Sequence, residues 1–235
     1  MPLRLSISRL FDALLPRACL LCGGDAGAHG LCRACADELP RLPDVRCPVC
    51  AAPLAAPAPA CGGCLARPPA FDATLAVWRY AHPLDSLVLG LKFRRRLAGA
   101  DFLAHALLAG PRPAGDVVVP VPLAPARLRE RGFNQSVEIA RPLARALGLP
   151  LDVACLARVR DTPPQSRLPW GARQGNVLDA FACATDLGGR AVIVVDDVMT
   201  TGATLDAVAR ALKERGAARV TNWVAARAVR GGEAI

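Results

Sequence analysis

Two hydrophobic periodicities alternate along residues 71–235 and predict a layered α/β domain. Runs of apolar and β-branched residues predict four strands, at residues 73–80, 116–122, 192–195 and 219–226. The segments beside them predict four helices, at residues 84–91, 97–108, 132–147 and 205–216. Because strands alternate with helices, we expect a parallel sheet whose connections are right-handed crossovers.

The segment that follows the strand at residues 192–195 combines two acids with a threonine-rich turn. Asp196 and Asp197 come at the C-terminal end of the strand, where open α/β sheets place their ligands. The turn 200–204, Thr-Thr-Gly-Ala-Thr, then leads into the helix. Gly202 lets the backbone approach an anion closely, and the free N–H groups of the helix point toward it. The pattern predicts a phosphate on the turn and two acids that face the polyol carrying it.

The complete order of strand, acids, turn and helix is much more restrictive than its parts. Paired aspartates alone can begin a turn, and threonine alone commonly caps a helix. The whole order resembles the phosphoribosyl-pyrophosphate (PRPP) motif of type I phosphoribosyltransferases. The resemblance implies that Asp196 and Asp197 are the catalytic acids, which hold the ribose hydroxyls, and that Mg²⁺ bridges those hydroxyls and the pyrophosphate. The implied PRPP-binding residues are Val198, Thr200, Thr201, Gly202, Ala203 and Thr204.

Eight of the ten cysteines form four C-x-x-C pairs near the start of the chain. The pairs are Cys19/Cys22, Cys32/Cys35, Cys47/Cys50 and Cys61/Cys64. One such pair points two thiolates at one ion, and two pairs complete a tetrahedral zinc site, so four pairs predict two structural Zn²⁺ sites. A disulfide framework is the alternative, but it needs an oxidising compartment and a secretory signal.

Two ways of pairing these cysteines into zinc sites stay open. The sequential scheme joins the first pair with the second and the third with the fourth, and we prefer it because each site is then a compact ribbon. The interleaved scheme joins the first pair with the third and the second with the fourth. The two remaining cysteines, Cys155 and Cys183, are interpreted as small hydrophobic core residues.

The formal net charge of +9 favours anionic partners, either phosphorylated metabolites or nucleic acid. Two basic clusters stand out, and they suit either the lining of a substrate cleft or the backbone of single-stranded DNA. Their members are Lys92, Arg94, Arg95 and Arg96 in the first, and Arg127, Arg129 and Arg131 in the second. Only 4% of the residues are aromatic, which argues against a broad base-stacking platform.

The first 15 residues contain apolar positions at helical spacing. Residues 3–15 predict a short amphipathic helix that docks on the protein, in preference to one that lies on a membrane surface. Arg4, Arg9 and Asp12 interrupt any signal-peptide core. No apolar stretch approaches the length of a membrane span, and we expect a cytoplasmic protein.

Several further segments resemble the ComF family of competence-associated proteins, which have an amidophosphoribosyltransferase-like domain. The matching segments are Leu-Lys-Phe at 91–93, Val-Pro-Val-Pro-Leu at 119–123, Arg-Gly-Phe-Asn-Gln-Ser at 131–136, and the spaced residues Arg158, Gln165, Leu168, Arg173, Asn176 and Phe181. The double zinc ribbon belongs to the same layout. The resemblance implies that residues 119–123 take the place of the pyrophosphate-side loop. It also makes Arg158, Gln165 and Arg173 candidates for a flexible loop that closes over PRPP.

The resemblance implies two parts in the chain: residues 1–70, with the amphipathic helix and double zinc ribbon, and residues 71–235, the type I phosphoribosyltransferase-like domain. The Ala- and Pro-rich stretch 51–70 is interpreted as the hinge region between them. The resemblance also implies a link to the handling of incoming single-stranded DNA and to DNA-uptake proteins. Two hypotheses follow: a phosphoribosyltransferase of unknown acceptor, or a non-catalytic DNA-handling factor that keeps the fold as a scaffold.

Overall fold

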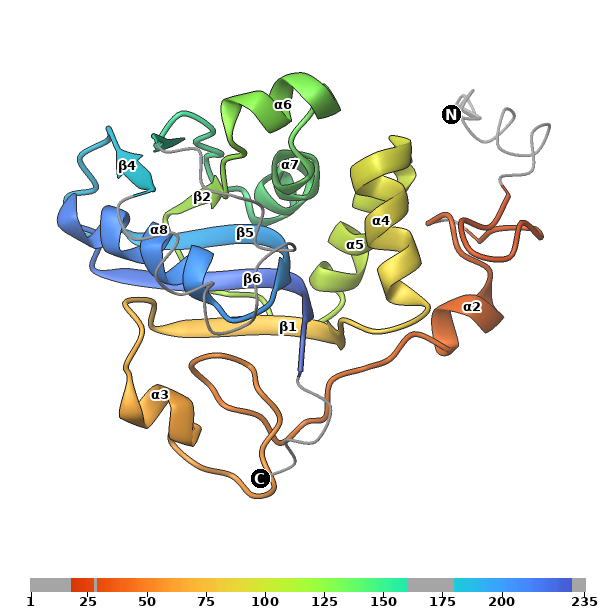
Figure 1. The fold of residues 1–235 in the computed structure, drawn as a ribbon, viewed down its shortest axis with the longest axis horizontal. Coiled ribbons are helices and arrows are strands. Elements are labelled where there is room, and N and C mark those ends of the chain that lie inside the picture. Colours follow the sequence, from red (N-terminus) through yellow and green to blue (C-terminus); the bar gives the residue numbers. More distant parts are fainter. Residues whose placement is uncertain (1–17, 28, 160–179, 230–235) are drawn as a thin grey trace, which may run out of the picture.

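The domain is built on a parallel four-stranded sheet with the strand order β1-β6-β5-β2 (Figure 1). This computed structural model describes residues 18–27, 29–159 and 180–229. The strands are β1 (Ala73–Arg79), β2 (Val117–Pro120), β5 (Ala191–Met199) and β6 (Arg219–Arg227). All three pairs of neighbouring strands are parallel, as the alternation of strands and helices predicts.

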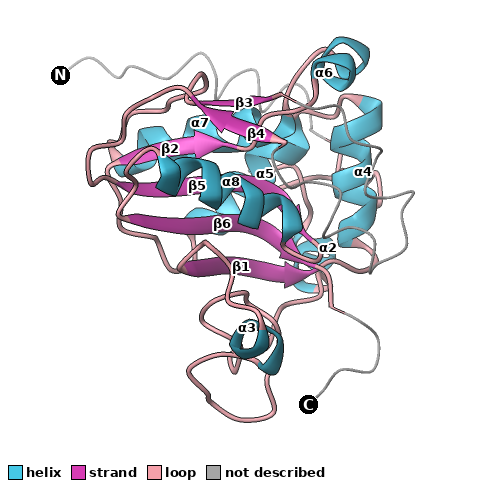
Figure 2. Ribbon diagram, turned by 60° about the vertical axis from the view of Figure 1, so that its left-hand side comes forward, coloured by secondary structure: helices cyan, strands magenta, loops and turns pink. Residues whose placement is uncertain are grey.

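Helices cover both faces of the sheet, and Figure 2 shows α8 in front of it with α5 and α7 behind. The helices are α4 (Leu84–Arg94), α5 (Ala98–Leu108), α7 (Gln135–Leu147) and α8 (Ala203–Glu214). The central strand β5 divides the hydrophobic core in two. Val192 and Val194 pack on the side of α8, whereas Ile193 and Val195 pack on the side of α4, α5 and α7. This alternation buries both faces of β5, as the continuous apolar run predicts.

Three short elements after residue 71 are not predicted from the sequence. They are α6 (Pro125–Arg131) and the antiparallel pair β3 (Leu156–Arg158) and β4 (Phe181–Cys183). Three-residue strands are too short to show a periodicity. Helix α6 has one apolar side chain beyond its first turn, and Gly132, with a φ of 82°, ends it. For this reason α7 begins at residue 135 rather than at 132.

Strand β5 is longer than the sequence predicts. The apolar run predicts a strand that ends at residue 195, but β5 continues to Met199. Asp196 pairs in register with Val224, and Val198 with Ala226, so the two acids lie within the hydrogen-bonded ladder. The sheet backbone therefore fixes the direction of both carboxylates.

The two cysteine-rich ribbons lie on opposite sides of β1. The first ribbon (residues 19–35) leads into α2 (Arg33–Asp37), beside α4 in Figure 1, and packs with the α4 side of the core. The second ribbon (residues 47–64) carries α3 (Gly62–Ala66), below β1 in the same view, and packs with the α8 side. Cys47 and Ala51 of the second ribbon have no exposed surface.

The segment that joins the ribbons runs antiparallel along the free edge of β1. The Leu42 N–H donates to the Val77 carbonyl at 3.0 Å, and the Arg79 N–H donates to the Pro40 carbonyl at 2.7 Å. Further along, the Ala70 N–H donates to Asp206 Oδ1 of α8 at 2.6 Å. The end of the predicted hinge is thus tied to the sheet domain, while the domain boundary at residue 70 stays a prediction.

Some predictions fall outside the described residues. They are the amphipathic helix at 3–15 and the loop candidates Gln165 and Arg173. Within the ranges that the structure does describe, none of the helices has the length and apolar run needed to cross a bilayer.

Candidate functional site

Asp196 and Asp197 are both buried near the C-terminal end of β5, with 9% and 3% of their surface exposed. The Ser136 hydroxyl, at the start of α7, donates to Asp196 Oδ1 at 2.8 Å. The Asp197 N–H donates to the same oxygen at 2.9 Å. Lys92 Nζ lies 2.5 Å from Asp197 Oδ2. Each carboxylate therefore has its own polar partner, and both are held in place.

The surroundings of Asp196 raise its affinity for a proton. Burial, and after it the negative charge of Asp197, raise the pKa of Asp196 to about 7, although Lys92 and the Ser136 hydroxyl oppose this shift. Burial would lower the pKa of Lys92, but the adjacent Asp197 outweighs it and the pKa is raised. Lys92 is thus positively charged at neutral pH, and Asp196 sits near its titration midpoint.

The turn after β5 has the backbone shape that close approach of an anion requires. Gly202 adopts a φ of 85°, and a Cβ atom there would lie 2.7 Å from Met199 Cε. A larger residue would therefore be strained by the positive φ, and the terminal methyl group of Met199 would have to move to make room for it. Helix α8 begins at the next residue, and the Ala203 N–H lies 3.3 Å from Thr201 Oγ1. The predicted order of strand, acids, turn and helix is present as one continuous unit.

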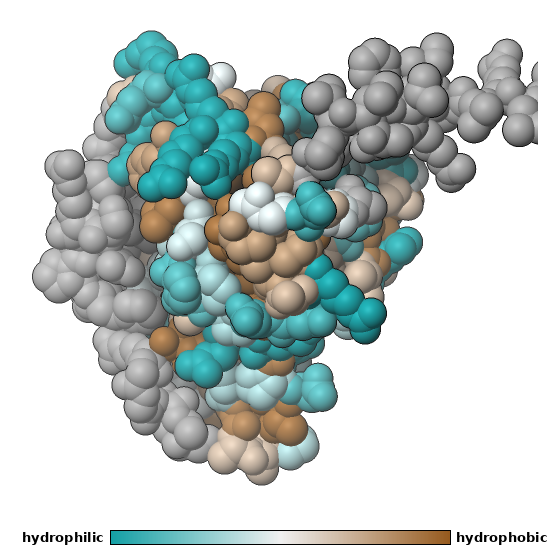
Figure 3. Space-filling view, turned by 90° about the vertical axis from the view of Figure 1, so that its right-hand side faces the viewer, coloured by the Kyte–Doolittle hydropathy of each residue, from teal (hydrophilic) through white to brown (hydrophobic). Residues whose placement is uncertain are grey.

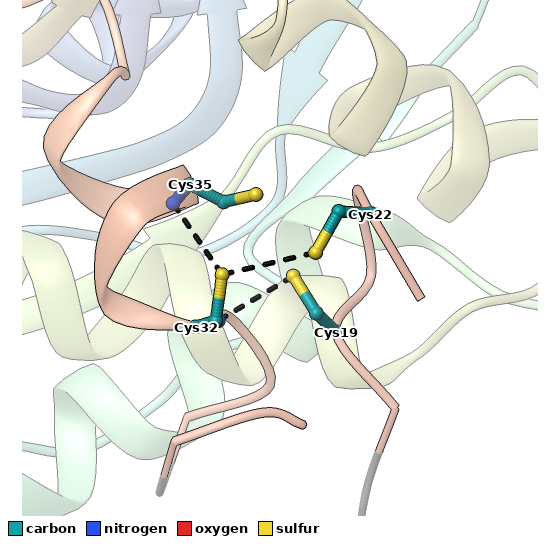
Figure 4. A group of neighbouring side chains, drawn as sticks. All are labelled: Cys19, Cys22, Cys32 and Cys35. Carbon is teal, nitrogen blue, oxygen red and sulfur yellow. Dashed lines mark hydrogen bonds between the residues drawn. The ribbon is translucent and has the colours of Figure 1, made fainter. Parts of the chain in front are cut away.

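The eight ribbon cysteines form two groups of four. In each group the sulfur atoms all lie within 4.8 Å of one another, and the grouping is the sequential one. Figure 4 shows the four side chains of the first group gathered around a common centre. The groups are Cys19, Cys22, Cys32 and Cys35, and Cys47, Cys50, Cys61 and Cys64.

The spacing of the sulfurs fits tetrahedral zinc. Cys22 Sγ and Cys32 Sγ are 3.8 Å apart, and Cys50 Sγ and Cys61 Sγ are 3.6 Å apart. Zinc–sulfur bonds of about 2.3 Å place two sulfurs of a tetrahedron about 3.8 Å apart. Although burial raises the pKa of Cys19, surrounding backbone N–H groups, that of Cys22 first, outweigh it and lower the pKa to about 6. Four cysteine sulfurs at this spacing are the donor set of a closed, structural site.

Comparison with known proteins matches both parts of the chain. A model of the phosphoribosyl transferase domain matches residues 134–233, and a model of the double zinc ribbon domain matches residues 10–65. The DNA utilization protein YhgH of Salmonella typhimurium is 38% identical over 219 residues, which cover 89% of this chain and 96% of the relative. Competence protein F of Haemophilus influenzae is 31% identical over 223 residues, with the same coverage of both chains. The chain belongs to the ComF family.

A further match covers less than half of this ComF protein. The ribose-phosphate pyrophosphokinase of Vibrio parahaemolyticus is 33% identical over 102 residues, which cover 40% of this chain and 28% of the relative. The family models and the relatives confirm the family and the phosphoribosyltransferase-like fold that the sequence predicted. The double zinc ribbon model and the two groups of four cysteines support the predicted structural zinc.

Lys92 differs from the other basic residues with which the sequence grouped it, because its side chain is directed into the protein. Its ammonium group is directed at Asp197, and only 22% of its side chain is exposed. The sequence contained a signal for this position. Lys92 falls four residues after Val88 and eight after Leu84, on the buried stripe of α4. A lysine on an apolar helical stripe indicates a buried charge with a partner.

The remaining basic candidates converge at one rim of the molecule, from two helices that are distant in sequence. Figure 3 shows hydrophilic side chains gathered at the top of this face, where α6 and the end of α4 lie. The Arg131 guanidinium lies 5.5 Å from the centre of the Phe93 ring, and Phe93 is 69% exposed. Arg96 instead donates to the Leu20 carbonyl of the first ribbon at 3.1 Å. We call the remainder the basic patch: Phe93, Arg94, Arg95, Arg127, Arg129 and Arg131.

Arg227, the last residue of β6, connects the second ribbon to the turn through its side chain. It was not among the residues predicted from the sequence. Its buried guanidinium donates from Nε to the Cys50 carbonyl at 2.8 Å. Nη1 donates to the carbonyls of Thr200 and Ala228. One side chain thus holds the backbone of a zinc ligand and the backbone of the candidate phosphate turn. Its signal in the sequence is weak: an arginine that ends a buried strand.

Two other predicted positions lie at the β3–β4 pair. The Arg158 guanidinium is 5.5 Å from the centre of the Phe181 ring. Cys155 is buried, as expected of a small core residue, but neither it nor Cys183 is isolated. Their sulfur atoms are 3.4 Å apart.

Proposed function

We propose that this ComF protein binds PRPP or a related ribose phosphate, together with Mg²⁺, at the acid pair and the turn. The observation that carries the proposal is the continuity of the unit: two buried, held carboxylates lead directly into a glycine turn and the start of α8. The match to a ribose-phosphate pyrophosphokinase over 102 residues supports a ribose phosphate as the ligand.

Each group in the site has a role that follows from its position. The N–H groups and hydroxyls of residues 200–204 donate to the 5′-phosphate, and Asp196 and Asp197 accept hydrogen bonds from the ribose hydroxyls. When pyrophosphate leaves C1′, positive charge develops on the ribose ring, and carboxylates fixed by the sheet stabilise that charge. Carboxylate oxygens also suit Mg²⁺, which is usually held by one or two carboxylates and substrate phosphates and supplies positive charge to the leaving group.

Calorimetric titration with PRPP, with and without Mg²⁺, tests the proposal. Replacing both acids with asparagine should weaken binding at least tenfold, about 1.4 kcal/mol or more. Because Asp197→Asn also removes the partner of Lys92, the single variant Asp196→Asn serves as the second arm with the ion pair intact. The exposed Asp44→Asn variant is the control for loss of one negative charge.

The result that overturns the assignment is equal affinity in the parent and the folded double variant, or no affinity of the parent for any ribose phosphate. A screen for pyrophosphate release, run on the same samples with varied acceptors, then separates a phosphoribosyltransferase from a protein that only binds the ligand.

A second candidate function, binding of single-stranded DNA, is favoured by the basic patch. The patch combines arginines with the exposed ring of Phe93, which is the combination that tracks a phosphate backbone and stacks on bases. The relatives' names, DNA utilization protein and Competence protein F, point in the same direction. On this proposal the handling of incoming DNA and contact with uptake proteins belong to the rim formed by α4 and α6.

Fluorescence anisotropy with a labelled oligothymidine over a series of salt concentrations tests this second function. Alanine at Arg94, Arg95 and Arg129 should weaken binding and reduce the slope of log K against log salt by about 2, since each phosphate contact contributes about 0.7. A control triple variant, with alanine at the exposed Arg141, Arg145 and Arg190, removes the same charge elsewhere. Equal losses in the two variants would show only a general effect of net charge.

A further inference from the structure

Two of the three histidines in this chain meet, although 76 positions separate them. His29 lies in the first ribbon, between Cys22 and Cys32, and His105 lies on α5. Their ring centres are 3.9 Å apart with an angle of 25° between the ring planes. Asp101 stands one helical turn before His105. One ligand atom from each of these three side chains lies within 4.8 Å of the other two.

We propose that His29, Asp101 and His105 form a third metal site, for a divalent transition-metal ion such as Zn²⁺, separate from the two cysteine sites.

The hydrogen bonding of His105 suits a metal ligand. His105 Nδ1 lies 2.9 Å from the Asp101 backbone carbonyl. A carbonyl only accepts hydrogen bonds, so this contact favours the tautomer with the proton on Nδ1, which also lies 3.5 Å from Asp101 Oδ1, and it leaves Nε2 with a lone pair. Metal-binding histidines commonly donate their second ring N–H to a backbone carbonyl or a carboxylate in this way.

The donor set defines the class of ion. Two imidazole nitrogens and one carboxylate oxygen suit Zn²⁺, Co²⁺, Ni²⁺ and Cu²⁺, whereas Mg²⁺ and Ca²⁺ prefer oxygen alone. Three protein ligands leave a coordination position open to water or to an exogenous group, unlike the closed cysteine sites. All three side chains are exposed, so the ion can exchange with solvent.

The location of the site gives it a structural consequence. His29 belongs to the first ribbon, and Asp101 and His105 belong to α5 of the sheet domain, so a bound ion would cross-link the two parts. Because an ion that binds only the folded arrangement stabilises it, occupancy should raise the melting temperature. The adjacent Arg96 bond to the Leu20 carbonyl attaches the same ribbon at a second point.

The test uses the untagged full-length protein with its two structural zinc ions in place. Titration with Co²⁺ or Zn²⁺ should show one further equivalent, and Co²⁺ should give an absorption spectrum without the thiolate charge-transfer bands of cysteine sites. His29→Gln and His105→Gln should each weaken this equivalent at least tenfold, and Asp101→Asn should weaken it less. Both histidine variants should retain the two tightly bound zinc ions.

The chain offers a matched control in its third histidine. His82 is exposed and lies 3.6 Å from Asp85, but the structure places no second histidine ring beside it in the described residues. His82→Gln should therefore bind the further equivalent as the parent does. The proposal is overturned if the parent binds no further ion, or if the double variant of His29 and His105 binds it undiminished. A loss in the His82 variant equal to that in the His105 variant would also overturn it.

Discussion

Lys92 and Asp197 form an ion pair of 2.5 Å inside the candidate active site, between the buried stripe of α4 and the end of β5. The pair places the positive charge of Lys92, whose pKa is raised, directly beside Asp197. The pKa of the other acid, Asp196, is raised. In the protein without ligand, the negative charge of the site is thereby partly neutralised from within. Removing either partner alone leaves the other buried and unpaired, which is costly.

We therefore expect Lys92→Met to lower the free energy of unfolding by about 3 kcal/mol, with the double variant Lys92→Met, Asp197→Asn recovering much of the loss. Urea unfolding of the parent, both single variants and the double variant measures the coupling. Lys213→Met is the control, since Lys213 forms a more exposed pair with Asp72 at 3.0 Å, and should cost less than about 1 kcal/mol. Equal losses at the two lysines would contradict a buried functional pair.

The pKa of Asp196 predicts how stability depends on pH. With a folded pKa of about 7 and an unfolded value of about 3.9, the folded protein binds this proton more tightly, so its contribution to stability declines as pH rises through that window. Asp196→Asn keeps an acceptor for Ser136 and removes the titration. We expect the variant to be more stable than the parent by about 1 kcal/mol, or 2–4 °C, at pH 8, with a smaller difference at pH 5. Thermal unfolding at both pH values checks this, and a gain that is independent of pH would argue against a buried titrating carboxyl.

Arg227 should couple the second zinc site to the turn. Arg227→Gln leaves the carbonyls of Cys50 and Thr200 without their shared donor, and we expect a loss of about 2–3 kcal/mol in unfolding free energy. The same variant should bind ribose phosphate more weakly and release one of its two zinc ions to a chelator sooner than the parent. The control is Arg79→Gln, which changes the exposed arginine at the end of β1. If ligand affinity and zinc release are both unchanged in the Arg227 variant, the side chain has no coupling role.

Zinc content is the most direct measurement. Protein purified under reducing conditions should contain two tightly bound zinc ions per chain, determined by plasma mass spectrometry after exhaustive desalting. Because Cys47 and Cys50 share the hydrophobic core of α8, chelation should also loosen the sheet domain, and not the ribbons alone. Disulfide bonds in place of zinc in such a preparation would rule out the assignment.

The sequence predicted most reliably what is local in the chain. The run from β5 through the acids and turn to α8 is contiguous, and each C-x-x-C pair carries its own geometry, so both could be recognised without a fold. The sequence did not separate Lys92 from its neighbouring arginines, because a run of basic residues does not show which of them faces the core. Which residues face the core depends on how α4 is rotated about its axis, and the buried residues Val88 and Leu91 show that rotation.

Contacts between distant segments could not be predicted from one sequence. The approach of Arg131 to Phe93, the stacking of His29 on His105 and the bond from Arg227 to Cys50 each join separate elements. Each depends on how helices and ribbons pack around the sheet, and no local pattern encodes that packing. The short β3 and β4 strands were missed for a related reason, because only their pairing with each other makes them strands.

Residues 40–42 occupy the outer edge of β1, and this has a consequence for how the protein can be divided. An uncovered strand edge is a template on which another chain can add a strand. A fragment that begins at residue 71 would expose the Val77 carbonyl and the Arg79 N–H, which residues 40–42 now satisfy. Such fragments should associate edge to edge, and a ComF relative without ribbons would have to protect this strand by other means. In this chain, the segment between the two ribbons covers that edge, so we expect the metal-binding module to protect the sheet from such association.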